Sequence, residues 1–474
     1  MTNDPAAEAA RKRRRHRNER IAASVLVLVL LIAVAAIIRW NKTEERALRS
    51  DLRYIPKETT ITPEILLLRD YVRIDTTTAD GVSKGARWLA DLLAKNGIQS
   101  ELIESTPGRL NVYVRIRGKQ RGGGLLLLNH IDVVPAGAAA WKHPPFSGDI
   151  EMNQLWGRGA LDMKGIALCH LLALAKLQRS GLTPEHDIAF LASGEEERGS
   201  DQGVKWLLAH RPDLFEGIAY AVTEGGITEV VSERVVYFGI EVGTKQHVQT
   251  YLDAPGEKEV HDARIALEPY MTSRESPRVL PEVRRFFADV APTRIGMKPL
   301  LEDIDRTIAQ GQTWRLAFPY RELMQNSLHV SAPWREKVGW SMSVLMSNLP
   351  DEDPDARVRW LQTMAAPYGI RVRVDRKEGP VPSSSTTTPL FSILAGEAEA
   401  FYGVRAGSEV LYSSVSDCRF LRPRGIACYG VSPYLVELTQ SLAIHHADER
   451  IRVDWFGNGI EYFGRVLEAW ARRT

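Results

Sequence analysis

The sequence predicts an α/β protein: a discontinuous domain with a mainly parallel sheet, an inserted ferredoxin-like α+β domain and one N-terminal transmembrane helix. Three observations support this fold class. Helical and strand patterns alternate from about residue 61 to residue 243, as in a parallel α/β layer. Residues 244–378 then follow a β-α-β-β-α-β order, with an extra segment near 275–320. The α/β pattern resumes after Gly379, so the middle module interrupts one discontinuous domain.

The transmembrane helix rests on a separate observation, an apolar stretch from Ile21 to Ile38 that is interrupted only by Ser24 and followed by Arg39 and Trp40. Its length is near the lower limit for a membrane-spanning helix. Residues 1–20 hold seven Lys/Arg and three acidic residues, which predicts a cytoplasmic N-terminus and a body on the outer, periplasmic or extracytoplasmic, side. The alternative is a signal peptide cleaved near Ala33-Val34-Ala35.

These boundaries divide the chain into six expected segments: a basic cytoplasmic tail (1–20), a single-pass anchor (21–40), a linker (41–60), the N-terminal part of the α/β domain (61–243), the inserted domain (244–378) and the C-terminal part of the α/β domain (379–474).

Charge and cysteine content exclude some classes of protein. The net charge is +2, and the basic excess lies in the N-terminal tail, which argues against nucleic-acid binding by the folded portion. Three cysteines are too few for a disulfide framework. Cys169 lies in an apolar helical run and is expected to be buried, whereas Cys418 and Cys428 either pair in an oxidising compartment or stay free.

Three hydrophobic runs end on side chains that bind metals or transfer protons. Leu125–Leu128 leads into His130 and Asp132, Ile188–Leu191 leads into Glu195-Glu196-Glu197, and Ala219–Val222 leads into Glu224. Because ligands bind at the carboxyl ends of strands in α/β sheets, this repetition predicts a metal site. Each residue alone has a simpler interpretation: a polar turn at His130, a helix cap at Asp162 and a solvated acidic turn at Glu195–Glu197.

The motifs in combination closely resemble one enzyme family. They are His130-Ile-Asp132, Trp156-Gly-Arg-Gly-Ala-Leu-Asp162-Met-Lys164-Gly165, Gly194-Glu-Glu-Glu197, Thr223-Glu224-Gly225-Gly226 and His445-x-x-Asp448-Glu449. This set is similar to the di-zinc metallopeptidases that include aminoacylase, carnosinase and vacuolar carboxypeptidase S (peptidase family M-twenty). The resemblance spans most of residues 63–470.

The resemblance implies two zinc ions per subunit, with cobalt or manganese as acceptable substitutes. His130 and Glu224 resemble the ligands of one ion, Glu196 and His445 those of the other, and Asp162 the bridging carboxylate followed by a cis peptide bond. Glu195 resembles the general base that acts on metal-activated water, and Asp132 the carboxylate that orients His130. The implied reaction is hydrolysis of a small peptide or N-acyl-amino-acid amide, with a carboxypeptidase or dipeptidase favoured over a deacylase. The resemblance also implies that residues 61–243 and 379–474 form the catalytic domain, and that the inserted residues 244–378 serve as a lid or dimerisation domain through which a homodimer forms.

The inserted domain departs from the family pattern. Where the family has a Gly-His-Ser-like turn, this chain reads Ala254-Pro255-Gly256-Glu257, and His261 is the nearest candidate replacement. Arg419, in Ser416-Asp417-Cys418-Arg419, resembles a substrate-binding arginine, with a surface strand-end residue as the alternative. A second functional hypothesis therefore stays open: a metal-binding, weakly active or inactive member that serves as an interaction module.

Overall fold

The structure is a computed structural model that describes residues 60–473, except 227, 231–234, 272–275, 295, 317–319, 378, 412–414 and 442. The expected basic tail, the anchor at 21–40 and all but the last residue of the linker lie outside this range. None of the helices within the described residues is long and apolar enough to cross a membrane. Residues 56–474 cluster as one compact unit, so the six expected segments stay predictions.

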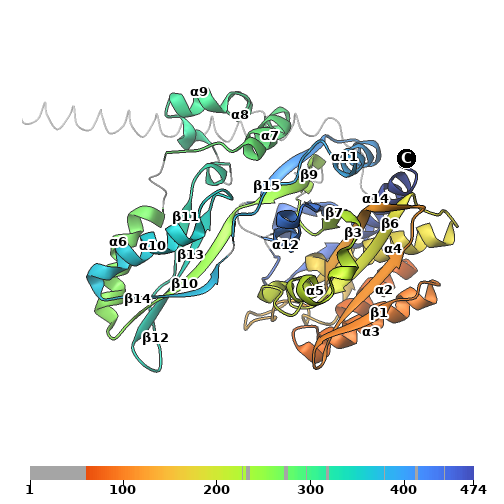
Figure 1. The fold of residues 1–474 in the computed structure, drawn as a ribbon, viewed down its shortest axis with the longest axis horizontal. Coiled ribbons are helices and arrows are strands. Elements are labelled where there is room, and N and C mark those ends of the chain that lie inside the picture. The colour runs from red at the N-terminus through yellow and green to blue at the C-terminus, as the bar shows by residue number, and fades with distance from the viewer. Residues whose placement is uncertain are drawn as a thin grey trace, which may run out of the picture. The chain divides into compact units, whose positions relative to one another are not determined.

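The larger sheet is mixed rather than mainly parallel (Figure 1). Its order is β1-β2-β6-β3-β7-β16-β9-β8-β17, and β15 also pairs with β9. The β6-β3-β7-β16 core is parallel as expected, but β1 and β2 are joined by a tight turn and therefore run antiparallel at one edge. The ten strands are β1 (Glu101–Thr106), β2 (Arg109–Ile116), β3 (Gln120–His130), β6 (His186–Ser193), β7 (Ile218–Thr223), β8 (Thr228–Val230), β9 (Val235–Thr244), β15 (Ala406–Leu411), β16 (Ala427–Gly430) and β17 (Val436–Glu437).

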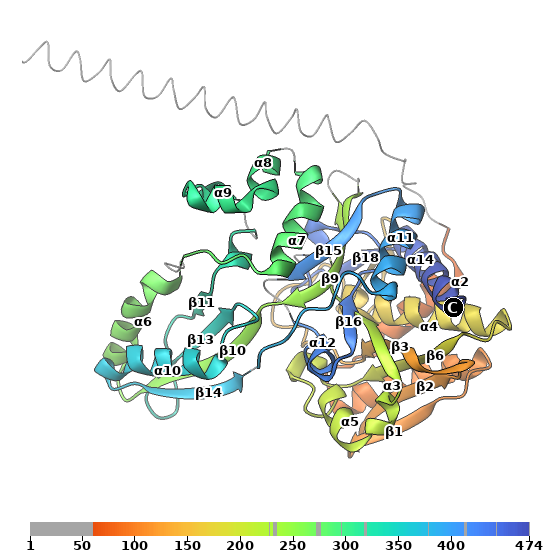
Figure 2. The same cartoon turned by 45° about the horizontal axis from the view of Figure 1, so that its top comes forward.

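The central strands are buried on both faces. Leu125 to Leu128 on β3 are at most 1% exposed, because helices cover the sheet on either side and leave no water-facing positions. The helices α4 and α14 lie side by side on one face (Figure 2). The helices that accompany the larger sheet are α2 (Pro63–Val72), α3 (Ala79–Lys95), α4 (Gly165–Arg179), α5 (Val204–His210), α11 (Pro389–Tyr402), α12 (Cys418–Leu421), α13 (Leu438–Ser441) and α14 (Val453–Ala471).

Local sequence signals begin and end these helices. The Thr78 hydroxyl accepts a hydrogen bond from the Gly81 N–H and caps α3. Pro63 and Pro389 occupy the first positions of α2 and α11, where a missing N–H costs nothing. A small three-stranded sheet, ordered β18-β5-β4, lies near the start of α14; its strands are β4 (Ile150–Glu151), β5 (Gln154–Trp156) and β18 (Arg450–Arg452).

The inserted module has the expected ferredoxin-like order. Its antiparallel sheet runs β11-β13-β10-β14, with β12 beside β13. The helices α6 and α10 lie together on one face of that sheet and bury its apolar residues (Figures 1 and 2). The elements are β10 (Gln246–Ala254), α6 (Glu257–Met271), β11 (Ser327–Val330), β12 (Trp334–Arg335), β13 (Trp340–Asn348), α10 (Pro354–Ala365) and β14 (Arg371–Lys377).

The extra segment between α6 and β11 forms α7 (Pro281–Val290), α8 (Lys298–Glu302) and α9 (Ile304–Ala309). Here α7 packs on β15 of the larger sheet rather than on the ferredoxin-like sheet. Asp289 fixes this contact, because its Oδ2 accepts hydrogen bonds from the Ser408 N–H at 3.1 Å and the Ser408 hydroxyl at 2.9 Å.

Candidate metal centre

The ends of three parallel strands bring the site together. β3 lies between β6 and β7, and the register pairs His130 with Ser193 and Leu127 with Val222. His130 closes β3, the glutamates follow β6, and Glu224 follows β7, so all reach the same edge of the sheet. This is the arrangement expected from the three hydrophobic runs.

Asp162 is supplied by η2 (Ala160–Lys164), a single turn ahead of α4. The Asp162–Met163 peptide bond is cis, which confirms what the family resemblance implied. Glu449 Oε1 accepts hydrogen bonds from the N–H groups of Leu161 (2.9 Å) and Asp162 (3.3 Å). The other Glu449 oxygen is 2.6 Å from Arg158, and this buried ion pair therefore holds the turn from behind.

Asp162 lies between two histidines. Its Oδ1 is 3.0 Å from His130 Nε2, which is also 3.3 Å from Glu224 Oε2. Its Oδ2 is 3.0 Å from His445 Nε2, which is also 3.2 Å from Glu197 Oε2. Four expected ligands, His130, Asp162, Glu224 and His445, are thus brought together, and Glu197 joins them.

Asp132 contacts His130 through its backbone carbonyl, and its side chain binds two backbone N–H groups of the glutamate turn. His130 Nδ1 lies 2.8 Å from the Asp132 carbonyl oxygen and 3.8 Å from its carboxylate. The carboxylate accepts hydrogen bonds from the N–H groups of Glu196 (3.1 Å) and Glu197 (3.2 Å). Asp132 therefore orients the imidazole through its carbonyl and fixes the glutamate turn through its side chain.

The three consecutive glutamates point in different directions. Glu195 adopts a left-handed backbone (φ 73°), and its carboxylate pairs with Arg109 at 3.2 Å and accepts from the Gln202 N–H. Glu196 is 7% exposed and lies 3.2 Å from Arg419 Nη2. The structure places Glu197, not Glu196, beside His445, and it places Glu195 outside the cluster.

Charge is concentrated at this edge of the sheet. Burial and the neighbouring Asp162 carboxylate raise the pKa of Glu224 well above its usual range. Burial would lower the pKa of His130, but Glu224 and Asp162 hold it well above the ordinary value. Hydrogen bonds to Asp162 and Glu197 raise the pKa of His445 to about 11. Three carboxylates therefore face only two imidazoles, and their negative charge is not fully balanced by the side chains of the cluster. Divalent cations bound there would neutralise it.

Metal ions fit this donor set. His130, Glu196 and Glu224 form one group whose ligand atoms lie within 4.8 Å of one another, and His130, Asp162 and Glu197 form another. Glu197 Oε1 is buried without a hydrogen-bond partner, although buried carboxylate oxygens normally have one, and Glu196 Oε1 has only its ion pair with Arg419. Imidazole and carboxylate donors suit zinc and similar divalent ions.

The remaining candidates are spread over other elements. Arg419 lies on α12, buried at 5% exposure against Glu196, rather than at the surface. His261 lies exposed on α6, on the helical side of the inserted sheet. His247 and His329 lie on the opposite side of this sheet. Each is next to a residue of the apolar cluster under the helices, Val248 or Leu328, and successive side chains of a strand point to opposite faces.

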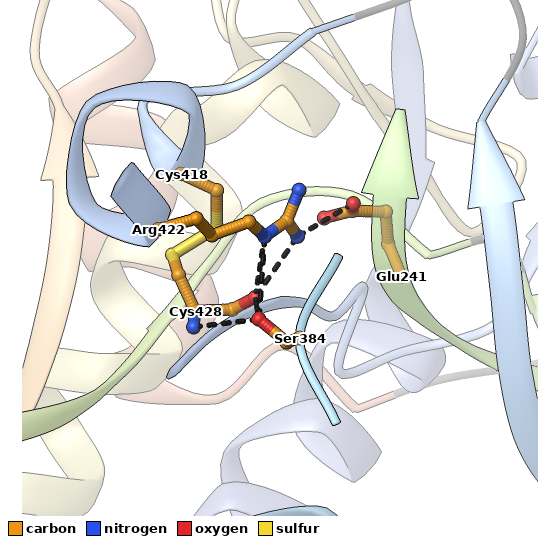
Figure 3. The surroundings of a disulfide bond; sticks show 5 residues. All are labelled: Glu241, Ser384, Cys418, Arg422 and Cys428. Atoms are coloured by element: carbon orange, nitrogen blue, oxygen red, sulfur yellow. Dashed lines mark hydrogen bonds and ion pairs between the residues drawn. A yellow bond between two sulfur atoms is a disulfide. The ribbon is translucent and has the colours of Figure 1, made fainter. Parts of the chain in front are cut away.

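Residues 418 and 428 are joined by a disulfide (Figure 3). Cys169 is free and buried, as expected. Of the two outcomes left open by the sequence for Cys418 and Cys428, the structure has the paired one.

A sequence profile of Peptidase family M20/M25/M40 matches residues 126–469. The chain belongs to this family. It is 27% identical over 422 residues to succinyl-diaminopimelate desuccinylase of Methylobacterium radiotolerans, over 85% of this chain and 96% of that protein. Membership confirms both the resemblance and the expectation of a metal-dependent hydrolase.

Two solved structures have a similar fold. The M20 family metallo-carboxypeptidase Sso-CP2 of Sulfolobus solfataricus has a TM-score of 0.66 at 19% identity, over 87% of this chain and 100% of that chain. Human carnosine dipeptidase 1 has a TM-score of 0.64 at 14% identity, over 86% of this chain and 97% of that chain.

Three contributors to the site were missed from the sequence. The sequence shows three consecutive glutamates, and nothing in it distinguishes Glu197 from the other two. The turn that points their carboxylates in different directions has no sequence pattern. Arg158 and Glu449 lie within the quoted motifs, but their pairing joins positions far apart in the chain and had no local signal.

Proposed function

We propose that the chain is a two-metal hydrolase of peptide or N-acyl-amino-acid amide bonds. The observation that carries this proposal is the position of Asp162, with one carboxylate oxygen toward His130 and the other toward His445. A carboxylate between two separate ligand sets is what a pair of metals about 3.5–4 Å apart requires.

The contacts support one ligand set of His130, Asp162 and Glu224, and a second of His445, Asp162 and Glu197. Two zinc ions held there would lower the pKa of a shared water and polarise the scissile carbonyl. Glu197 thereby takes the ligand role that the family resemblance had suggested for Glu196.

Glu196 is the better candidate for the general base. Its carboxylate is buried and belongs to the cluster with His130 and Glu224, and its Oε1 makes an ion pair with Arg419 but accepts no hydrogen bond. Such an oxygen can accept a proton from water and return it to the leaving nitrogen. Glu195, the base suggested by the resemblance, belongs to neither group of clustered ligands, and its carboxylate is held by Arg109 and by the Gln202 N–H.

We propose substrates that carry a carboxylate near the scissile amide. Arg419 presents a guanidinium beside Glu196, and a guanidinium matches a carboxylate in shape and charge. The desuccinylase relative, whose name indicates removal of a succinyl group, supports an N-acyl amide as strongly as the peptidase-like folds support a peptide. The homodimer through the inserted domain also stays a proposal.

We further propose that residues 21–40 anchor the enzyme with its body outside the cytoplasm. The apolar run from Ile21 to Ile38 and the basic residues before it support this orientation. The Cys418–Cys428 disulfide supports it independently, because disulfides persist in oxidising compartments.

The experiment compares Glu196→Gln with Glu195→Gln in the full-length, detergent-solubilised, zinc-loaded protein. Hydrolysis of N-succinyl amino acids and dipeptides should fall by about 10²–10⁴-fold in kcat for Glu196→Gln, with two metals per chain retained. Glu195→Gln should keep kcat within a few-fold. Equal losses in both variants would reject the assignment of the base. Absence of hydrolysis with bound metal would favour the alternative, an inactive interaction module.

A further inference from the structure

The Cys418–Cys428 disulfide links the strand layer to the residues around Glu196. Cys418 is the first residue of α12, and Cys428 lies on β16, ten residues later in the chain. β16 pairs in parallel with β7, and the last pair of that register joins Gly430 to Thr223, the residue before Glu224. One end of the disulfide is therefore attached to the strand beside a proposed metal ligand.

The Cys428 end is held rigidly (Figure 3). Its carbonyl oxygen accepts hydrogen bonds from Arg422 Nη2 at 2.9 Å and from the Ser384 hydroxyl at 2.7 Å, and its N–H donates to the same Ser384 oxygen. Arg422 also pairs with Glu241 at 2.6 Å, and both side chains are buried. This network leaves β16 little freedom to move.

The Cys418 end lies between two residues that contact the glutamate turn. Asp417 accepts a hydrogen bond from the Ser200 hydroxyl, and Ser200 follows the turn that carries Glu196. Arg419 approaches Glu196 Oε1 to 3.2 Å. Its helix, α12, is only one turn long and is too short to hold that position by its own hydrogen bonds.

We propose that the Cys418–Cys428 disulfide positions Asp417 and Arg419 against Glu196, so that turnover depends on its oxidised state. This inference rests on the proposed role of Glu196. Reduction by a phosphine is balanced: the disulfide takes up two electrons and two protons to give two thiols, and the phosphine becomes its oxide with oxygen from water. The released α12 turn can then shift relative to Glu196.

A purely structural disulfide would behave differently. Closing a loop of this size stabilises the fold mainly by restricting the unfolded chain, so its loss would lower the melting temperature and leave kcat unchanged at low temperature. A positioning disulfide instead changes kcat well below the melting temperature, because misplacement by about 1 Å near reacting groups can cost on the order of a hundredfold in rate.

The test uses the full-length zinc-loaded protein and two variants. The double variant Cys418→Ala/Cys428→Ala lacks the disulfide, and Cys169→Ala is the matched control. Wild type and Cys169→Ala should lose about tenfold or more in kcat with a phosphine reductant, with little change in KM, and should recover on reoxidation. The double variant should be equally slow and insensitive to the reductant, which also controls for metal stripping. Peptide mapping checks that residues 418 and 428 are joined before treatment.

Hydrogen exchange of residues 196–203 and 415–424 gives a readout that does not need activity. Faster exchange in both segments on reduction supports the proposal even if no substrate has been found. Unchanged exchange and unchanged kcat in reduced protein would overturn it, as would free thiols at both positions in untreated protein. Failure of the proposed function is distinguishable, because it would appear as full activity of Glu196→Gln or as a lack of bound metal, whatever the redox state.

Discussion

Asp162 and His445 are 283 residues apart in the chain, yet Asp162 Oδ2 lies 3.0 Å from His445 Nε2. The other oxygen of the same carboxylate is 3.0 Å from His130 Nε2. The two halves of the proposed metal centre therefore share one side chain.

Asp162→Asn should remove both metals rather than one. An amide supplies a single neutral oxygen and cannot bridge two cations as a carboxylate does. Metal analysis of dialysed protein should fall from two ions per chain to less than one, with hydrolysis lost. Asp91→Asn, on the exposed side of α3, should keep both ions. A variant that retains one tightly held ion would contradict the shared position of Asp162.

Metal removal should destabilise the fold. Without cations, the buried carboxylates of Asp162, Glu197 and Glu224 repel one another, and ligand binding to the native state alone adds about 2.7 kcal/mol at a hundredfold excess over Kd. Chelator should lower the melting temperature, and zinc should restore it in a concentration-dependent way. Glu197→Gln should weaken this response and Glu195→Gln should not. Identical responses of the two variants would contradict the proposed ligand set.

The buried Arg158–Glu449 pair should contribute to the stability of the fold. Arg158→Met leaves Glu449 without its partner, which should cost about 3–5 kcal/mol in the free energy of unfolding. The matched control is Lys84→Met, which breaks the exposed Lys84–Asp80 pair and should cost under about 1 kcal/mol. Urea titrations measure both. If both variants lose less than about 1 kcal/mol in the free energy of unfolding, the buried Glu449 carboxylate does not need Arg158 as a partner, and the prediction is wrong.

His170 should make the metal-free protein sensitive to acid. Burial lowers its pKa to about 3, and its Nδ1 lies 2.8 Å from Asn129 Oδ1. The unfolded chain binds a proton that the folded chain excludes between about pH 3 and 6.5. Stability is therefore complete above about pH 6.5 and falls as the pH drops, by at most about 1.4 kcal/mol per unit.

His170→Asn in chelator should reduce this slope in urea titrations from about pH 7.5 to 5. His261→Asn, on the exposed side of α6, should leave it unchanged. An identical slope in wild type and His170→Asn would mean that other groups control acid unfolding.

Deletion of residues 2–40 should release the enzyme from membranes. The full chain should remain in the membrane fraction after carbonate extraction, since an apolar segment of this length inserts stably. The deletion variant should appear in the soluble fraction with unchanged kcat. Mature protein that begins just after Ala35 would instead establish a cleaved signal peptide.

The sequence predicts the central parallel strands, the order of the inserted module and four of the clustered ligands well. Their signals are local: a leucine run ending on His130, or a glycine-rich turn ending on Asp162. The antiparallel edge at β1 and β2 was missed because strand direction depends on loop geometry. The choice among Glu195, Glu196 and Glu197 depends on one left-handed residue and on hydrogen bonds to Asp132, and neither leaves a periodic pattern.

The position of His445 also determines when the site can form. A ribosome adds about 5–20 residues per second, so His445 emerges roughly a quarter of a minute to a minute after Asp162. During that interval Glu197, Glu224 and the whole inserted module are still being made. A nascent chain can therefore offer every proposed ligand except His445, and any truncated product that ends before residue 445 lacks the ligand that completes the second metal set.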